Sequence, residues 1–302
     1  MHPFATHGPV WPQLVALGAV DDATWERGAA WLDHHLPEGP HREERIHWLT
    51  LPVASWVLHH LRAAERRPLM VGLNAPQGAG KTTLTTSLVG LFAELGVRAV
   101  SVSIDDFYLR RSEQLALASR HPGNPFLEHR GYPGTHDVEL GARVLQALRD
   151  GHDVDLPRYD KSAHGGRGDR SDEVTPIRGR VDVVLLEGWM LGFQPVERVS
   201  DERLRVPNEA LRDYAAWTDR LDVLINLRMK ASSQVIQWRI EAEQAMRASG
   251  KPGLTDAEVE DYVRRFLPAY DTWSGTLSKE QSLTLTLDAQ RVPITPSSKT
   301  QP

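Results

Sequence analysis

The stretch NAPQGAGKTTLTTSL, from Asn74 to Leu88, decides the fold of this chain. Its first part, Ala75–Thr82, follows the phosphate-loop pattern GxxxxGKS/T, with alanine in place of the first glycine. Glycines in such a turn let successive backbone N–H groups converge on phosphate oxygens, and the following helix directs its positive dipole end at the same anion. The apolar run Pro68–Asn74 precedes the turn and an amphipathic pattern follows it, as a strand, loop and helix require.

The loop is therefore predicted to bind the phosphates of ATP. We expect Lys81 to reach the β- and γ-phosphates and the Thr82 hydroxyl to hold Mg²⁺. A glycine-rich turn without a ligand is the alternative, and the triplet Gly80-Lys81-Thr82 disfavours it. The residues expected to contact the nucleotide here are Ala75, Gln77, Gly78, Ala79, Gly80, Lys81, Thr82 and Thr83.

Composition limits the remaining possibilities. The chain has 302 residues, which suffice for one large domain or for a domain with an inserted lobe. A net charge of −5 argues against nucleic acid as the main partner, and the absence of cysteine excludes disulfides and thiol catalysis. No apolar run reaches the roughly 20 residues that span a bilayer, and the N-terminus lacks a secretory pattern. We expect a cytoplasmic enzyme that acts on a small molecule, away from membranes.

Strand and helix patterns alternate after residue 67. Four short runs rich in Val, Leu and Ile have the length of strands buried on both faces, and helical patterns separate them. These runs are Pro68–Asn74, Val97–Ile104, Arg180–Gly188 and Arg220–Leu227. This order predicts an α/β fold of the P-loop NTPase class, a mostly parallel sheet with helices on both faces. A fifth run, Ser282–Ala289, alternates polar and apolar residues and is expected at a sheet edge.

Two acidic positions at strand ends indicate phosphoryl transfer. Asp105 follows the second run, where its carboxylate can accept the proton of an acceptor hydroxyl and help to hold the metal. Glu187 ends the third run, at the position of a Walker-B acid that orients water on Mg²⁺. The alternative is that Asp105 and Asp106 only cap a turn. The expected catalytic residues are Asp105, Lys81 and Glu187, and the expected metal ligands are Thr82, Asp105 and Glu187.

A later helical pattern, QWRIEAEQAMR, spaces charged residues by one turn each. Arg239, Glu243 and Arg247 would then lie on one face of a helix. Arg239 and Arg247 can close over the nucleotide phosphates as a lid, and are counted as nucleotide-binding residues. A solvent-exposed face held by salt bridges explains the same spacing equally well.

Four segments, in this order, resemble the glycerate kinases of the plant and yeast type. The segments are SIDDFY (103–108), NPFLEHRGYPGTHD (124–137), PRYDKSAHGGRGDR (157–170) and VVLLEGWMLGF (183–193). These kinases belong to the wider pantothenate kinase, uridine kinase and phosphoribulokinase group, and the resemblance runs from about Leu69 to Tyr270. It implies ATP-dependent phosphorylation of D-glycerate at its 3-hydroxyl, with Asp105 as the base and Glu187 as the Walker-B-type acid.

The segment 110–178 breaks the strand–helix rhythm. It is rich in Gly, Pro, His and Arg and shows only one clear helix, so it is expected to cover the carboxyl edge of the sheet as a substrate-binding insertion. Its basic residues suit a carboxylate or a phosphate better than a nucleobase. The residues expected to contact the acceptor are Asp106, Tyr108, Arg130, His136, Arg158, Tyr159, Lys161 and Arg167, with Asp137, Asp160 and Arg170 as further candidates.

The sequence thus predicts three parts. They are an N-terminal helical segment (1–66), a P-loop kinase domain (67–290) with the insertion (110–178) and lid helices (231–268), and a mobile tail (291–302). Two alternatives to glycerate phosphorylation stay open. One is a kinase of the same fold for a nucleoside, pantothenate or a sugar phosphate, and the other is an ATP-dependent regulator that is not a kinase.

Overall fold

A six-stranded sheet forms the centre of the computed structural model, which describes residues 6, 8–248, 250, 254–277 and 279–295. The strand order is β2-β5-β1-β6-β7-β8. All neighbouring pairs are parallel except the last, in which β8 runs antiparallel to β7. The strands are β1 (Leu69–Asn74), β2 (Ala99–Ser103), β5 (Val183–Gly188), β6 (Val223–Met229), β7 (Ser282–Leu287) and β8 (Pro293–Ile294). The predicted α/β class is confirmed.

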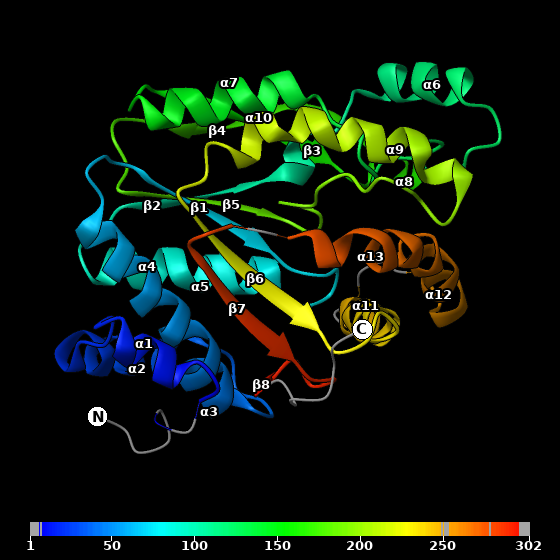
Figure 1. Ribbon diagram of the computed structural model, residues 1–302. Coiled ribbons are helices and arrows are strands. Elements are labelled where there is room, and N and C mark those ends of the chain that lie inside the picture. Colours follow the sequence, from blue (N-terminus) through cyan, green and yellow to red (C-terminus); the bar gives the residue numbers. More distant parts are fainter. Residues whose placement is uncertain (1–5, 7, 249, 251–253, 278, 296–302) are drawn as a thin grey trace.

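Helices cover both faces of the sheet (Figure 1). Alternate side chains of a strand point to opposite faces. Val71 and Leu73 of β1 therefore enter the core that lies under the N-terminal helices and α5 (Lys81–Glu94). Met70 instead enters the core that contains Leu145 of α7 (Val138–Arg149) and Trp217 of α10 (Ala215–Thr218). Burial on both faces explains why β1 and β5 read as unbroken apolar runs.

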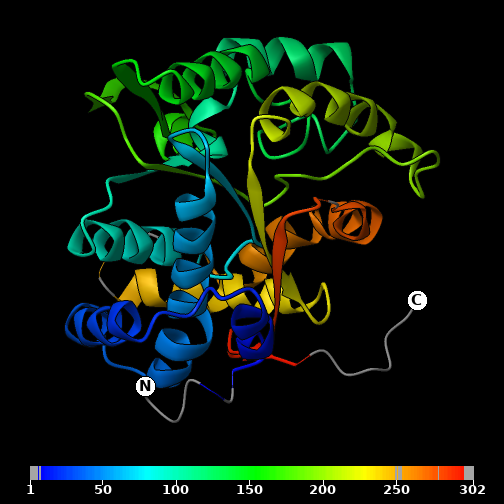
Figure 2. The same cartoon turned by 60° about the vertical axis from the view of Figure 1, so that its left-hand side comes forward.

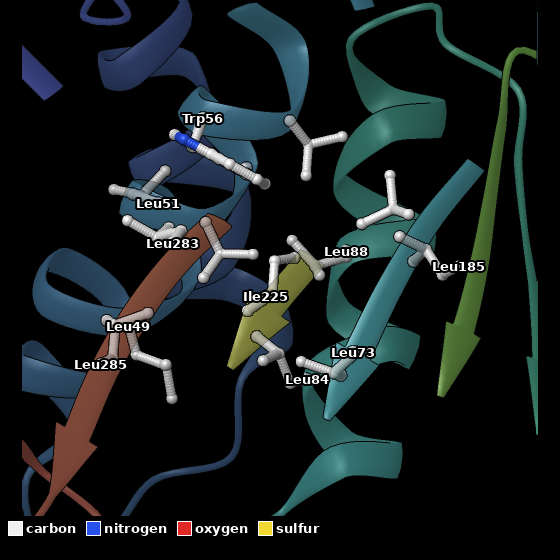
Figure 3. Close-up of a cluster of buried hydrophobic side chains, with 14 of the residues drawn as sticks. Leu49, Leu51, Trp56, Leu73, Leu84, Leu88, Leu185, Ile225, Leu283 and Leu285 are labelled. Carbon is white, nitrogen blue, oxygen red and sulfur yellow. The ribbon is translucent and has the colours of Figure 1, made fainter. Parts of the chain in front are cut away.

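Helices make up most of the described part of residues 1–66, as expected. They comprise α1 (Trp11–Ala16), α2 (Asp22–His35), α3 (Arg42–Glu44), the π-helical turn η2 (Arg45–Thr50) and α4 (Leu51–Ala63). Figure 2 shows α4 lying along the sheet. Figure 3 shows Leu51 and Trp56 from this segment beside Leu88 of α5 and Leu283 of β7. The segment therefore completes one of the two cores of the sheet.

The insertion holds more regular structure than the sequence indicates. It contains α6 (Arg111–Arg120), α7, α8 (Ala163–Gly166) and an antiparallel hairpin of β3 (Val154–Asp160) and β4 (Asp169–Ile177), and it follows the 3₁₀ turn η3 (Ile104–Phe107). Sequence reasoning found only α7. Helix α6 buries only Gln114 and Leu117, so it has almost no apolar stripe. The hairpin is largely exposed, and a register shift near Pro157 interrupts its alternation.

The C-terminal third completes the fold. After β5 come η4 (Glu202–Leu204), α9 (Arg205–Ala210), η5 (Leu211–Tyr214) and α10, and after β6 come α11 (Gln234–Ala248), α12 (Asp256–Arg264), α13 (Leu267–Trp273) and η6 (Ser274–Thr276). The run expected at the sheet edge, β7, lies instead between β6 and the short β8. Arg291–Ile294, assigned by the sequence to a mobile tail, is instead part of a turn and of β8. Residues 296–302 of that tail lie outside the described residues.

Candidate active site

The phosphate loop joins the end of β1 to the start of α5. Gly78 and Gly80 have φ of 77° and 89°, in the left-handed region that favours glycine. Gly80 stands at the N-cap of α5 and provides no side-chain cap, so the first backbone N–H groups of the helix remain available to an anion. Lys81, the first residue of α5, donates from Nζ to the carbonyls of Ala75 at 3.1 Å and Pro76 at 3.2 Å.

Lys81 is partly buried, and its ammonium lies near two carboxylates and near the cations of Lys161 and Arg239. Burial lowers the pKa of Lys81, and the carboxylates of Glu187 and Asp105 oppose that shift. The parallel register brings these groups together, because Glu187 on β5 pairs with Leu73 of β1 on one side and with Ser103 of β2 on the other. The two acids that the sequence placed at separate strand ends thus share one edge of the sheet with the phosphate loop.

Asp105 lies in η3, directly after β2. Its Oδ2 accepts a hydrogen bond from Lys161 Nζ at 2.6 Å. Burial would raise the pKa of the Asp105 carboxyl, but the ammonium groups of Lys161 and Lys81 outweigh burial and lower this pKa below its usual value. Asp105 is therefore a charged carboxylate at neutral pH, with a lysine from the hairpin resting on it.

Glu187 is the more deeply buried acid, with 8% of its surface exposed. Burial raises the pKa of its carboxyl, and Lys81 and a hydrogen bond with Ser103 partly offset that effect. Among the described residues no group of three or more His, Cys, Asp or Glu side chains gathers at a metal site. Mg²⁺ usually takes only one or two protein carboxylates, with waters and substrate phosphates filling the other positions. Asp105, Glu187 and the exposed hydroxyl-bearing Thr82 fit such a sparse donor set.

Asp106 has a different role from its neighbour. Its Oδ2 accepts from Arg158 Nη1 at 3.0 Å, and its Oδ1 accepts from the backbone N–H of Tyr159 at 3.1 Å. Burial raises the pKa of Asp106, and Arg158 opposes that shift. Each consecutive aspartate therefore holds a different part of the insertion, since Asp106 binds strand β3 and Asp105 binds Lys161 just beyond it.

His136 lies beside this pair, with its ring stacked on Tyr108 at 4.2 Å between centroids. The Gly134 N–H donates to Tyr214 Oη at 3.0 Å, so the Tyr214 hydroxyl is free to donate to His136 Nδ1, 2.7 Å away. Burial lowers the pKa of His136 to about 3, so the ring is neutral, and donation from Tyr214 to Nδ1 would place the ring proton on Nε2. His136 Nε2 is buried without a partner among the described residues, which leaves one oriented donor for a ligand.

Two predicted acceptor arginines, Arg130 and Arg167, contact other parts of the insertion. Arg130 donates from Nη1 to Gly166 O at 2.9 Å and to Arg167 O, and from Nη2 to Lys161 O at 3.3 Å. Its guanidinium also lies 5.5 Å from the centre of the Tyr159 ring, so it shapes the turn of the hairpin. Arg167 is bonded to the His129 imidazole.

Arg170 and the remaining acid candidates also hold the insertion together. The guanidinium of Arg170 donates to Tyr108 O at 3.0 Å and to Asp137 Oδ2 at 3.3 Å. Asp137 also caps α7 through Leu140, and Asp160 accepts from Ser162. Of the predicted basic residues, Arg158 and Lys161 are therefore the two that the structure brings to the aspartate pair.

The two predicted lid arginines separate. Arg239 pairs with Glu243 at 2.7 Å on its own helix, and its backbone N lies against Gly78 of the phosphate loop. Arg247 lies eight residues farther along α11, roughly 12 Å at the rise of an α-helix. Its guanidinium bonds Asp256 at 2.7 Å and the Leu254 carbonyl, which ties α11 to α12. The structure thus places Arg239 next to the loop and Arg247 at the contact between α11 and α12, and their binding of nucleotide stays a prediction.

Sequence reasoning missed two residues that hold the loop from outside. Tyr270 Oη accepts from the Gln77 N–H at 3.0 Å, across 193 residues of chain. Arg291 Nε donates to Gly78 O at 2.7 Å, across 213 residues. Local sequence patterns do not predict contacts between residues so far apart in the chain. Gln77 Oε1 and Arg239 Nε are buried near the loop without a partner among the described residues, as expected where a polar ligand binds.

Known proteins resemble this chain over most of its length. The model of the phosphoribulokinase/uridine kinase family matches residues 70–202. The chain is 38% identical over 280 residues to the chloroplastic D-glycerate 3-kinase of Arabidopsis thaliana, a match that covers 84% of this chain and 61% of the plant protein. The match therefore spans less than two thirds of the plant protein. An uncharacterized kinase of Schizosaccharomyces pombe is 36% identical, with 76% of this chain and 91% of that kinase covered.

The similarity extends to three dimensions. A D-glycerate 3-kinase from Cryptococcus neoformans superposes with a TM-score of 0.76 at 32% identity, covering 82% of this chain and 97% of the fungal chain. Within the part of the chain that the structure describes, no helix is long and apolar enough to cross a membrane.

Proposed function

The chain belongs to the phosphoribulokinase/uridine kinase family, with D-glycerate 3-kinases among its relatives, and on that premise we propose that it transfers the γ-phosphoryl group of ATP to the 3-hydroxyl of D-glycerate. One observation carries the proposal. Asp105, charged and paired with a hairpin lysine, shares the carboxyl edge of the sheet with the phosphate loop and with Glu187. That arrangement supports a base for an alcohol beside a cradle for a triphosphate.

The nucleotide would occupy the phosphate loop. The N–H groups at the start of α5 and the Lys81 ammonium would bind its β- and γ-phosphates, for which Lys81 leaves the carbonyls of Ala75 and Pro76. Thr82, Asp105 and Glu187 would hold Mg²⁺, which when bound neutralises charge on the transferred group. Arg239, next to Gly78, would add a further positive charge from the side of α11.

The acceptor would be bound between the loop and the hairpin. Arg158 uses Nη1 to bond Asp106 and its side chain is 52% exposed, so the rest of its guanidinium fork is available to a carboxylate. Lys161 can leave Asp105 for the same anion. His136 Nε2 supplies a neutral donor suited to a hydroxyl. This set matches a small hydroxy acid, because it has cations for a carboxylate and one neutral donor for an alcohol.

The chemistry then requires little covalent participation from the protein. The 3-oxygen of glycerate attacks the γ-phosphorus while the bond to the β-bridging oxygen breaks, giving 3-phosphoglycerate and ADP. Asp105 orients the hydroxyl and accepts its proton late, since the loose transition state of phosphoryl transfer needs only a weak base. The proton then passes to solvent, and Lys81 stabilises the charge that grows on the leaving ADP.

A coupled ADP-release assay tests this function. D-glycerate should support turnover, whereas L-glycerate, a nucleoside, pantothenate, a sugar phosphate and a no-acceptor blank should support far less. Asp105→Asn should lower kcat about 10²–10⁴-fold, the usual contribution of general-base catalysis, and keep ATP binding. Asp219→Asn, at an exposed acid directly after α10, is the matched control and should behave as wild type. Turnover with another acceptor class alone, or a fully active Asp105→Asn, would refute the assignment.

A further inference from the structure

The turn between β7 and β8 contains Arg291, whose side chain contacts the phosphate loop. Arg291 has φ of 64°, a backbone conformation that residues with a side chain rarely adopt. Asp288 stabilises it, since Asp288 Oδ1 accepts from the N–H groups of Gln290 at 2.9 Å and Val292 at 2.8 Å. The Asp288 carbonyl accepts from the Arg291 N–H at 3.1 Å. From this turn the Arg291 side chain reaches α11 and the phosphate loop.

The guanidinium of Arg291 joins the phosphate loop to α11. Its Nε donates to Gly78 O of the phosphate loop at 2.7 Å, and its Nη1 pairs with Glu241 Oε2 of α11 at 2.6 Å. Its Nη2 donates to Trp238 O at 3.1 Å, and the cation lies 5.5 Å from the centre of the Trp238 ring. All three guanidinium nitrogens are therefore used at once, which only the planar fork of arginine allows.

Trp238 fixes α11 against the same loop. Its side chain is fully buried, and its Nε1 donates to Ala289 O in the β7–β8 turn at 2.7 Å. A Cβ placed on Gly78 would lie 2.8 Å from Trp238 Cβ and 3.2 Å from the backbone N of Arg239. The first turns of α11 therefore rest directly on the phosphate loop, and the position of Arg239 depends on this contact.

The bond to Gly78 also sets the orientation of the loop. In a trans peptide the carbonyl of one residue and the N–H of the next point in opposite directions. Because Arg291 holds Gly78 O on the outer side, the Ala79 N–H is turned inward, where it donates to Pro76 O at 3.2 Å. Lys81 Nζ contacts the same carbonyl, so the inward side is the side on which phosphates would bind.

We propose that Arg291 is a positioning residue of the nucleotide site. It holds the Gly78–Ala79 peptide, and with it the turn in which the Ala79 N–H closes on Pro76 O, and it holds α11 so that Arg239 lies beside the phosphate loop. This inference rests on the proposed nucleotide site of the phosphate loop and does not depend on which acceptor is phosphorylated.

Nucleotide binding without acceptor tests the role. Calorimetric Kd values for ADP and ATP, KM for ATP and for D-glycerate, and Tm are measured for Arg291→Met, Arg291→Lys and Glu241→Gln. Arg264→Met is the control, because Arg264 is an exposed arginine whose ion pair with Glu260 lies within α12. We expect Kd and KM for ATP to rise about tenfold or more in Arg291→Met, consistent with loss of a charged hydrogen bond, with KM for D-glycerate within twofold. Arg291→Lys should restore little, and Glu241→Gln should shift Kd in the same direction by less.

The nucleotide Kd and the Tm of the variants together decide whether Arg291 positions the nucleotide site. A lower Tm with unchanged nucleotide Kd in the folded variants would show that Arg291 is merely structural and would overturn the inference. If Arg291→Met does not fold, Arg291→Lys and Glu241→Gln decide by the same criterion. A wild-type protein that binds no nucleotide would refute the proposed function itself, and the inference with it.

Discussion

Replacing Gly78 by alanine measures how firmly α11 rests on the phosphate loop. The variant meets two obstacles, since Gly78 has φ of 77° and its new Cβ would lie 2.8 Å from Trp238 Cβ and 3.0 Å from the Trp238 backbone carbon. Gly96 provides a matched control. It also has φ of 77°, but nothing lies within 4 Å of its Cβ position. The difference between the two alanine variants therefore isolates the contact with Trp238.

The expected magnitudes follow from these two terms. The left-handed backbone costs a residue with a Cβ about 1–2 kcal/mol, and this cost applies to both variants. Gly78→Ala adds overpacking against a fully buried side chain and backbone, which costs about 1–3 kcal/mol more because neither neighbour is a flexible chain end. At about 2 °C per kcal/mol for a chain of this size, Tm of Gly78→Ala should lie about 2–6 °C below that of Gly96→Ala.

Urea unfolding at equilibrium, with calorimetric Tm as a second measure, compares the two variants without ligand. Equal losses of unfolding free energy would mean that α11 stands clear of the loop in solution. In that case the first turns of α11 would be a mobile lid, and the contacts of Trp238 and Arg239 with Gly78 could not position the nucleotide. Nucleotide affinity should fall in Gly78→Ala and stay unchanged in Gly96→Ala.

Further variants test the acceptor side and the pH dependence. Lys161→Met should raise KM for D-glycerate at least tenfold. It should also move the acid limb of the kcat/KM–pH profile to higher pH, because the Lys161 ammonium lowers the pKa of Asp105 in the wild type and its removal raises that pKa. An acid limb at the same pH in the variant would contradict the pairing of Lys161 with Asp105. Arg158→Lys should raise KM for D-glycerate but not for ATP, since an ammonium cannot grip a carboxylate bidentately; equal changes in both KM values would argue against it. Arg247→Met should keep KM for ATP within twofold, and a large rise would restore its predicted lid role. Burial lowers the pKa of His136 to about 3, so below the unfolded value of about 6.5 only the unfolded chain takes up its proton. Unfolding free energy should then decrease by up to about 1.4 kcal/mol per pH unit from pH 6.5 to 5, and urea titrations of His136→Gln should give a shallower slope.

The sequence predicted what short patterns encode. The phosphate loop, Lys81 and the strand-end acids Asp105 and Glu187 lie within or beside buried apolar runs, whose length and composition are a local property. The parallel register then brings strand ends to one edge, so that the proximity of Glu187 to the loop follows from the topology alone.

The rest depends on contacts that sequence spacing does not carry. The sequence indicates Arg130 as a candidate anion-binding residue, but it cannot show that the Arg130 guanidinium donates to backbone carbonyls around the hairpin turn. Arg247 has the spacing of a lid residue, but Asp256 on the next helix binds it. Helix α6 and the β3–β4 hairpin were missed because their side chains are mostly exposed and show weak periodicity.

The contact of Lys161 with Asp105 bears on whether bound ATP would be hydrolysed by water when no acceptor is bound. A water molecule is small enough to enter whenever the acceptor is absent, and it would need a carboxylate to orient its attack on the γ-phosphate. The 2.6 Å bond from Lys161 already occupies Oδ2 of that carboxylate. A hydroxy acid brings a negative charge that can draw the lysine away, whereas water brings none. If the proposed function holds, this contact would slow the hydrolysis of bound ATP until a hydroxy acid binds.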